Sequence, residues 1–142
     1  MIGQYRDSNG IVKTGWVYLN NIWYYLNEEG IMATGWKIVN GAWYFFNESG
    51  VMQIGWQIIG GVRYYFDMEN HEMVTGYRVI DNVLYYFDAN GASRGICGPQ
   101  TGWYQADGKW YYIRGGRALT SERTVINNVW YEFDENGVWV TE

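Results

Sequence analysis

A glycine followed by an aromatic residue recurs along the chain at nearly constant spacing. The pairs are Gly15-Trp16, Gly35-Trp36, Gly55-Trp56, Gly76-Tyr77 and Gly102-Trp103. They are separated by 20, 20, 21 and 26 residues, and a sixth unit starts at Glu122-Arg123 without the pair. A period of about 20–50 residues is typical of proteins in which one small unit is repeated and stacked. The sequence therefore predicts six copies of one unit.

Each unit continues with a turn dipeptide and then a cluster rich in aromatic residues. The dipeptides are Asn20-Asn21, Asn40-Gly41, Gly60-Gly61, Asp81-Asn82, Asp107-Gly108 and Asn127-Asn128. Asn, Asp and Gly tolerate the positive φ angles that a two-residue type I′ turn requires, and this turn joins two antiparallel strands. Each unit is therefore predicted to be a β-hairpin.

A second type of turn links one hairpin to the next. Its sequences are Asn27-Glu28-Glu29-Gly30, Asn47-Glu48-Ser49-Gly50, Asp67-Met68-Glu69-Asn70, Asp88-Ala89-Asn90-Gly91 and Asp134-Glu135-Asn136-Gly137. An Asx side chain can open such a turn, and Gly or Asn can close it in the left-handed region. Asp7-Ser8-Asn9-Gly10 has the same pattern, so residues 1–14 are interpreted as a half-repeat.

An isolated hairpin is only marginally stable in water, so the units are expected to bury their faces against one another. We therefore predict an all-β fold, a solenoid of stacked β-hairpins of about 20 residues each, in a single repeat domain over residues 1–142. The units begin near residues 15, 35, 55, 76, 102 and 122. Residues 95–101 contain the single Pro and are expected to form an irregular connector.

Charge and composition argue against several classes of function. The net charge of -5 and the pI near 4.8 disfavour nucleic acid and anionic membranes, which select basic surfaces. No apolar segment is long enough for membrane insertion, and residues 1–10 are too polar for a signal peptide. Cys97 and His71 are each the sole residue of their type, and no phosphate-binding loop occurs, so we expect a non-enzyme without metal or cofactor.

Strand alternation separates two faces of the first hairpin. If the turn lies at Asn20-Asn21, Trp16, Tyr18, Trp23 and Tyr25 share one face, here called the aromatic face. The other face, here called the core face, carries Val17, Leu19, Ile22, Tyr24 and Leu26. If the aromatic faces of consecutive hairpins meet, their rings form an open box, which suits a quaternary ammonium group because ring faces attract cations.

Residues Gly35 to Met52 read Gly-Trp, then Asn-Gly-Ala-Trp-Tyr-Phe, then Asn-Glu-Ser-Gly-Val-Met. This pattern resembles the choline-binding, or cell-wall-binding, repeat of Gram-positive surface proteins and phage lysins, and the resemblance covers about residues 4 to 140. Related repeats occur in glucan-binding domains and in the carbohydrate-binding ends of clostridial toxins. The resemblance implies ligand sites between consecutive units, built from two aromatic residues of one unit and one of the next, often with a Met nearby.

Transferred to this sequence, the resemblance implies a first site of Trp16, Trp23 and Phe45 flanked by Met32, and a second of Trp36, Trp43 and Tyr65 flanked by Met52. Weaker sites are implied at Trp56 with Tyr86, where Arg63 replaces a Trp, and at Trp103 with Trp110, where Glu132 occupies the third aromatic position.

The expected function is a non-catalytic module that binds choline of teichoic acid or a similar surface polymer. Two alternatives stay open at this point: binding of a glucan or another glycan through the Trp faces, and a structural spacer or oligomerisation segment. The expected location is extracellular or cell-wall-associated, with the export signal outside this sequence. A homo-oligomer is compatible with the sequence.

Overall fold

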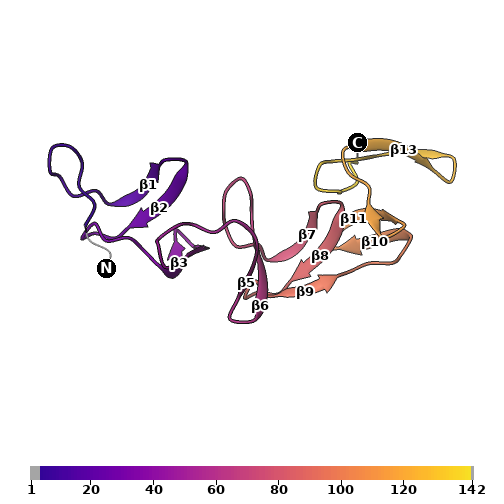
Figure 1. Ribbon diagram of the computed structural model, residues 1–142. Helices are drawn as coiled ribbons and strands as arrows, with labels where there is room; N and C mark the ends of the chain where they lie inside the picture. Colours follow the sequence, from indigo (N-terminus) through magenta and orange to yellow (C-terminus); the bar gives the residue numbers. More distant parts are fainter. Residues whose placement is uncertain (1–3, 142) are drawn as a thin grey trace. The chain divides into compact units, whose positions relative to one another are not determined.

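The computed structural model describes residues 4–141, and this part of the chain contains fourteen β-strands and no helix (Figure 1). The strands are β1 (Gly15–Leu19), β2 (Ile22–Leu26), β3 (Gly35–Val39), β4 (Ala42–Phe46), β5 (Gly55–Ile59), β6 (Val62–Phe66), β7 (Gly76–Ile80), β8 (Val83–Phe87), β9 (Ser93–Ile96), β10 (Gly102–Ala106), β11 (Lys109–Arg114), β12 (Arg117–Ala118), β13 (Glu122–Ile126) and β14 (Val129–Phe133). Consecutive strands pair to form the six predicted hairpins, and β9 and β12 each add a third strand to a hairpin. The all-β hairpin fold is confirmed.

The turns within the hairpins have the predicted backbone conformation. Asn20 and Asn21 have φ angles of 51° and 66°, and the corresponding pairs in the other five hairpins are likewise positive at both residues. These are the angles of a type I′ turn, whose twist matches that of the strands it joins. A seventh turn of this kind, at Gly115-Gly116 with φ angles of 59° and 81°, joins β11 to β12 and was not predicted.

The predicted register of the first hairpin is also confirmed. Trp16 pairs with Tyr25, and Tyr18 pairs with Trp23. Trp16 and Tyr18 on the aromatic face are 37% and 53% exposed, whereas Leu26 on the core face is 1% exposed. The two faces therefore differ in burial as the alternation indicates.

The linking turns are closed by their Asx side chains. Asn27 Oδ1 accepts hydrogen bonds from the N–H groups of Glu29 and Ile31 at 2.9 and 3.0 Å, and the turns at Asn47, Asp88 and Asp134 repeat this pair of bonds. The third turn differs from the prediction, because its left-handed residue is His71 (φ 68°) rather than Asn70. The turn is one residue longer there, which accounts for the 21-residue interval.

The chain divides into two compact units. One comprises residues up to Gly61 together with Tyr65–Met73, and the other comprises Val62–Tyr64 together with residues from Val74 onward. The stacking of all six hairpins into one solenoid and one domain stays a prediction. Strand β9 includes Gly95 and Ile96, so the irregular connector expected at residues 95–101 begins only at Cys97, whose N–H donates to the Leu84 carbonyl at 3.0 Å.

The last residue of the second strand is buried in five of the six hairpins, and in the fifth hairpin the buried residue is Ile113, one position before the exposed Arg114. Those that are at most 1% exposed are Leu26, Phe46, Phe66, Phe87 and Phe133. In the second unit, Phe133 packs with Leu119 and Ile126. Within residues 4–141, no helix is long and apolar enough to cross a membrane.

Candidate ligand-binding site

The fifth hairpin, β10–β11, carries a cluster of aromatic rings that line one hollow. Trp103 on β10 and Trp110 on β11 have ring centroids 6.2 Å apart at an interplanar angle of 87°. Tyr131 on β14 lies 4.8 Å from Trp103 at 67°, and Trp139 lies 6.0 Å from Trp103 at 62°. The four rings line a hollow of about 380 Å³, here called the fifth box.

A packing contact and two main-chain hydrogen bonds hold the rings of the fifth box in place. The buried Phe133 packs against Trp103, with the ring centroids 5.8 Å apart, but does not itself line the hollow. The N–H of Trp139 donates to the main-chain carbonyl of Trp110 at 2.8 Å, and the N–H of Val140 donates to that of Glu132 at 2.8 Å. The segment that carries Trp139 is therefore bonded to both the fifth and the sixth hairpin.

The chemistry of the fifth box favours a cation with apolar substituents. Only aromatic side chains line it, and Trp110 is 38% exposed, so the hollow is accessible. Rings that meet nearly at right angles direct several negative π faces at one point, and methyl groups gain from contact with the same faces. A quaternary ammonium group meets both requirements.

A similar arrangement occurs at the first hairpin and is here called the first box. Trp16 and Trp23 are 6.2 Å apart at 89°, and Tyr44 from the second hairpin lies 4.9 Å from Trp16 at 72°. Tyr25, the cross-strand partner of Trp16, has its ring centroid 4.9 Å from that of Trp16. The N–H of Met52 donates to the Trp23 carbonyl at 3.2 Å.

The second hairpin repeats the perpendicular pair of tryptophans. Trp36 and Trp43 are 6.2 Å apart at 83°, and Trp36 also contacts Phe66 at 5.7 Å. The N–H of Met73 donates to the Trp43 carbonyl at 2.8 Å. The same two-tryptophan geometry therefore occurs in hairpins one, two and five.

Two families of repeat sequences match the chain. The choline-binding repeat matches residues 13–54 and 33–75, and the putative cell wall binding repeat matches residues 75–93 and 101–115. The chain belongs to the choline-binding repeat family. Repeat domains of this family are generally non-catalytic binding modules, and the proteins that carry them are cell-surface or secreted proteins.

Solved structures of choline-binding repeats have the same fold. CbpJ from Streptococcus pneumoniae TIGR4 is 37% identical, with a TM-score of 0.63 over 98% of this chain and 45% of that chain. Choline binding protein F from S. pneumoniae is 35% identical, with a TM-score of 0.61 over 93% of this chain and 49% of that one. The endolysin from phage Cp-1, solved in complex with choline, is 26% identical, with a TM-score of 0.52 over 84% of this chain and 36% of that one.

This choline-binding repeat chain thus spans less than half the length of each of the three solved chains. No curated protein sequence matches it. Among residues 4–141, no group of three or more His, Cys, Asp or Glu side chains is placed to hold a metal ion.

In the first box, the ring of the next hairpin that contacts Trp16 differs from the predicted one. Phe45, predicted for the first site, lies 5.2 Å from Trp36 of its own hairpin, and Tyr65, predicted for the second, lies 5.1 Å from Trp56 of its own hairpin. The ring that reaches Trp16 from the next hairpin is Tyr44. The reason is that the aromatic face of one hairpin meets the core face of the next, so the partner is displaced by one residue.

In the fifth box, too, the ring from the next hairpin is displaced by one residue from the predicted position. The sequence placed this site among the weaker ones. Glu132 was taken to occupy the third aromatic position, but the residue that faces Trp103 is Tyr131. The sequence contained a signal for it, because a Tyr stands at this position in all six repeats: Tyr24, Tyr44, Tyr64, Tyr85, Tyr111 and Tyr131.

The flanking roles of Met32 and Met52 stay predictions. The main-chain N–H of Met52 donates to the Trp23 carbonyl of the first box, and the Met32 side chain and the Tyr24 ring both lie beside Gly50. Trp139 stands two residues after the left-handed glycine of its linking turn, the position that Met32 and Met52 occupy after theirs. This correspondence could have identified the fourth ring from the sequence.

The fourth hairpin has no pair of tryptophans, because the residue at the position of the second Trp is part of the hydrophobic core. Leu84 stands where four of the other five repeats carry the second Trp, and it is 1% exposed in a cluster with Ala106, Tyr111, Ile113 and Ala118. Burial raises the pKa of the Tyr111 hydroxyl and of the Cys97 thiol, as expected beside an apolar cluster. Tyr86, predicted as a weaker ligand residue, packs on Tyr77 of its own hairpin at 4.7 Å.

Restoring the consensus Trp at position 84 is expected to destabilise the protein rather than create a site. Leu84→Trp inserts a larger side chain into a filled core, which costs about 1–3 kcal/mol. Urea unfolding followed by circular dichroism measures this cost. A variant that keeps full stability and gains a choline site would contradict the assignment of Leu84 to the core.

Proposed function

We propose that this chain is a non-catalytic module that binds choline groups of a teichoic acid or a similar cell-surface polymer. The observation that carries the proposal is the fifth box, in which Trp103, Trp110, Tyr131 and Trp139 surround an accessible hollow lined by no charged side chain. Choline is a quaternary ammonium with three methyl groups, and such a group fits a box of ring faces.

The expected affinity of one box is modest. A cation–π contact contributes about 0.5–1 kcal/mol when exposed and about 2 kcal/mol when desolvated. Three such contacts sum to about 4 kcal/mol, which corresponds to a Kd of about 1 mM. Weak sites of this kind suit a polymer, because several boxes on one chain engage it together and raise the avidity.

Of the two boxes, we expect the one at the fifth hairpin to bind choline more tightly than the one at the first hairpin. The fifth box has four rings, whereas the first has Trp16, Trp23 and Tyr44 with the ammonium of Lys37 5.8 Å from the ring of Tyr25. A resident cation beside the first box lowers its attraction for a second cation. A cation also lies beside the fifth box, since the Arg114 guanidinium is 5.7 Å from the ring of Tyr112, so the ranking rests on the fourth ring, Trp139.

Titration of the whole chain with choline chloride tests the proposal. We expect tryptophan fluorescence and calorimetry to show saturable binding with a millimolar Kd, and ammonium chloride at matched concentration to give no saturable response. Added salt of about 0.5 M should leave the binding in place, because it screens ion exchange by the acidic surface more than contacts inside a box. No saturation up to about 50 mM choline, many times the expected Kd, would overturn the proposal.

A further inference from the structure

Two arginines stand directly opposite each other on the short hairpin that β12 adds to β11. The two strands are joined by the Gly115-Gly116 turn, and the register pairs Arg114 with Arg117. The next pair, Ile113 with Ala118, is buried at 3% and 2% exposure. Because side chains alternate between the faces of a strand, the two arginines point away from the core, and both are exposed.

This arginine pair is unfavourable for the fold. Like charges directly opposite each other on neighbouring strands are destabilising. Within residues 4–141, neither guanidinium forms an ion pair, whereas Arg94 on β9 is paired with Asp88 at 2.8 Å. Arg114 and Arg117 therefore present two adjacent forks of N–H donors that no carboxylate of the described residues neutralises.

The main chain that carries the arginine pair is fixed on both sides. At the turn, the N–H of Gly116 donates to the Gln100 carbonyl at 2.8 Å. At the far end of β12, the N–H of Ala118 donates to the Asn82 carbonyl, also at 2.8 Å. A preorganised main chain lowers the entropy that is lost when the side chains bind a ligand.

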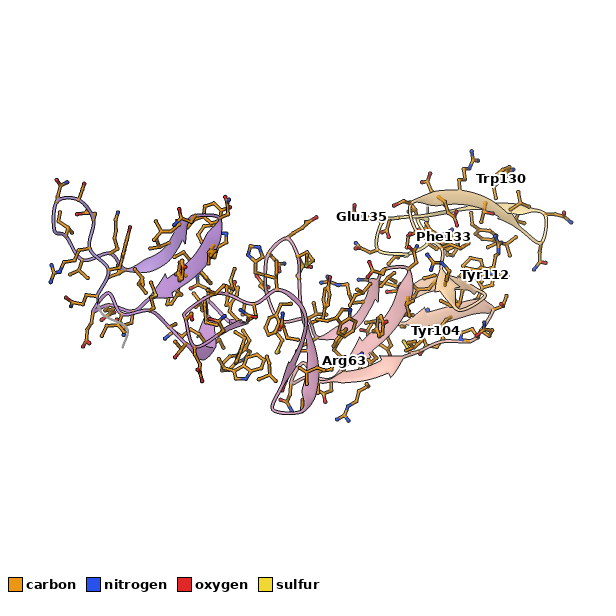
Figure 2. The ribbon with its side chains drawn as sticks, in the orientation of Figure 1. Arg63, Tyr104, Tyr112, Trp130, Phe133 and Glu135 are labelled. Atoms are coloured by element: carbon orange, nitrogen blue, oxygen red, sulfur yellow. The ribbon has the colours of Figure 1, made fainter. Side chains whose placement is uncertain are left out.

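The arginine pair adjoins the fifth box. Tyr112 and Arg114 lie on the same face of β11, and the Arg114 guanidinium is 5.7 Å from the centroid of the Tyr112 ring. The Tyr112 ring is in turn 5.1 Å from that of Trp103 in the box. Figure 2 shows Tyr112 on the side of the fifth hairpin that faces β13–β14. The pair and the box are therefore neighbouring features of one face, connected through Tyr112.

Two guanidinium groups at this spacing favour a phosphate group. The Cβ atoms of directly opposite residues are about 4.5–5.5 Å apart, so two long side chains can converge on one ligand. The two oxygens of a carboxylate match one guanidinium fork, whereas the oxygens of a phosphate can accept from two. The net charge of -5 disfavours long polyanions, but it does not repel a phosphate joined to a quaternary ammonium, because that combination is zwitterionic.

We propose that Arg114 and Arg117 form an anion subsite that binds one phosphate group beside the fifth box. The subsite goes beyond the proposed choline function and does not depend on it, because inorganic phosphate alone can bind both guanidinium groups. A polymer whose choline is attached through a phosphate ester can engage the box and the subsite together. The charge of Arg114, which disfavours free choline, then favours the ester.

Titration of the whole ¹⁵N-labelled chain with inorganic phosphate, at constant pH and ionic strength, tests the subsite by NMR. The side-chain Nε–H signals of Arg114 and Arg117, assigned from their loss in Arg114→Gln and Arg117→Gln, are expected to shift saturably with a millimolar Kd. Each substitution should weaken phosphate binding at least tenfold, the effect of losing a charge-assisted hydrogen bond. Arg117→Gln should unfold at the parent urea concentration or above it, because it removes a like-charge contact.

Arg94→Gln is the matched control. Arg94 is also exposed but is held by Asp88, so its loss should leave phosphate binding unchanged, and its own Nε–H signal should not shift. Absence of saturation at Arg114 and Arg117 up to about 50 mM phosphate overturns the proposal. An equal shift at Arg94, tighter binding of acetate than of phosphate, or a lower urea midpoint for Arg117→Gln would overturn it as well.

Phosphocholine distinguishes two sources of the phosphate. If the phosphate is attached to the choline held in the box, phosphocholine should shift the Arg114 and Trp110 signals together and bind several-fold more tightly than choline or inorganic phosphate. If the phosphate belongs to another position along the polymer, phosphocholine should bind the arginine pair no more tightly than inorganic phosphate does. Either result supports the subsite. Choline alone, followed at the Trp110 indole signal, reports separately on the choline function.

Discussion

Replacing Trp110 by Ala is expected to weaken choline binding at the fifth box by at least tenfold. The substitution removes one of the four rings, and a desolvated cation–π contact of about 2 kcal/mol corresponds to about a thirtyfold change in Kd. The main-chain conformation should be retained, because the hydrogen bond that positions Trp139 is accepted by the backbone carbonyl of residue 110, which the substitution does not remove. The measurement is the choline dependence of the Trp103 indole N–H signal, which isolates this box from the others.

Trp130→Ala provides the control for this prediction. Trp130 occupies the position of Trp110 in the next repeat but does not line the fifth box, so its loss should leave the choline response of Trp103 unchanged. If Trp110→Ala folds and binds choline at the parent affinity, the fifth box is not the principal site. If both variants lose choline binding, the box extends further than the four rings described.

Replacing Phe133 by Ala is expected to lower the free energy of unfolding by about 3–5 kcal/mol, the usual cost of truncating a buried Phe. Phe133 is 1% exposed and packs against Leu119, Ile126 and the ring of Trp103. A loss of this size is a large fraction of the roughly 5–15 kcal/mol that stabilises a typical domain. Because Phe133 packs against Trp103 of the fifth box, choline affinity should fall together with stability.

Urea unfolding followed by circular dichroism measures the effect of Phe133→Ala. Val129→Ala, on the same strand, is the matched control: Val129 is 50% exposed, and its truncation should change stability by about 0.5 kcal/mol or less. A Phe133→Ala variant that unfolds at the same urea concentration as the parent would contradict the assignment of Phe133 to the core. Excess choline should raise the midpoint of the parent, because a ligand that binds only the folded state stabilises it.

Much of the fold follows from local sequence signals. Asn20-Asn21 and its counterparts select a type I′ turn by their tolerance of positive φ, and the turn then sets the register that pairs Trp16 with Tyr25. The extra residue in the third linking turn moved the left-handed position from Asn70 to His71 without changing the hairpins on either side. Strand β12 escaped prediction because it is only two residues long, although Gly115-Gly116 marked its turn.

The candidate site was only partly predictable. The tryptophan pairs, such as Trp16 with Trp23 and Trp103 with Trp110, belong to single hairpins, and the structure brings each pair together as the spacing indicates. The relative completeness of the sites was harder to predict: the site expected to be weak because of Glu132 contains four rings that line one hollow. The ligand roles of these residues remain predictions for the titrations described above.

The sequence by itself determined the hairpins, their turns and the separation of an aromatic from a core face, because turn conformation and strand alternation depend on residues close together in the chain. Only the tertiary structure decided which faces of neighbouring hairpins meet. That choice is made by packing between units, and a change of one residue along a strand exchanges its two faces. In the tertiary structure, Tyr44 and Tyr131 therefore lie against the tryptophans where the sequence suggested positions 45 and 132. Trp139 adds a fourth ring to the fifth box, and Leu84 is buried.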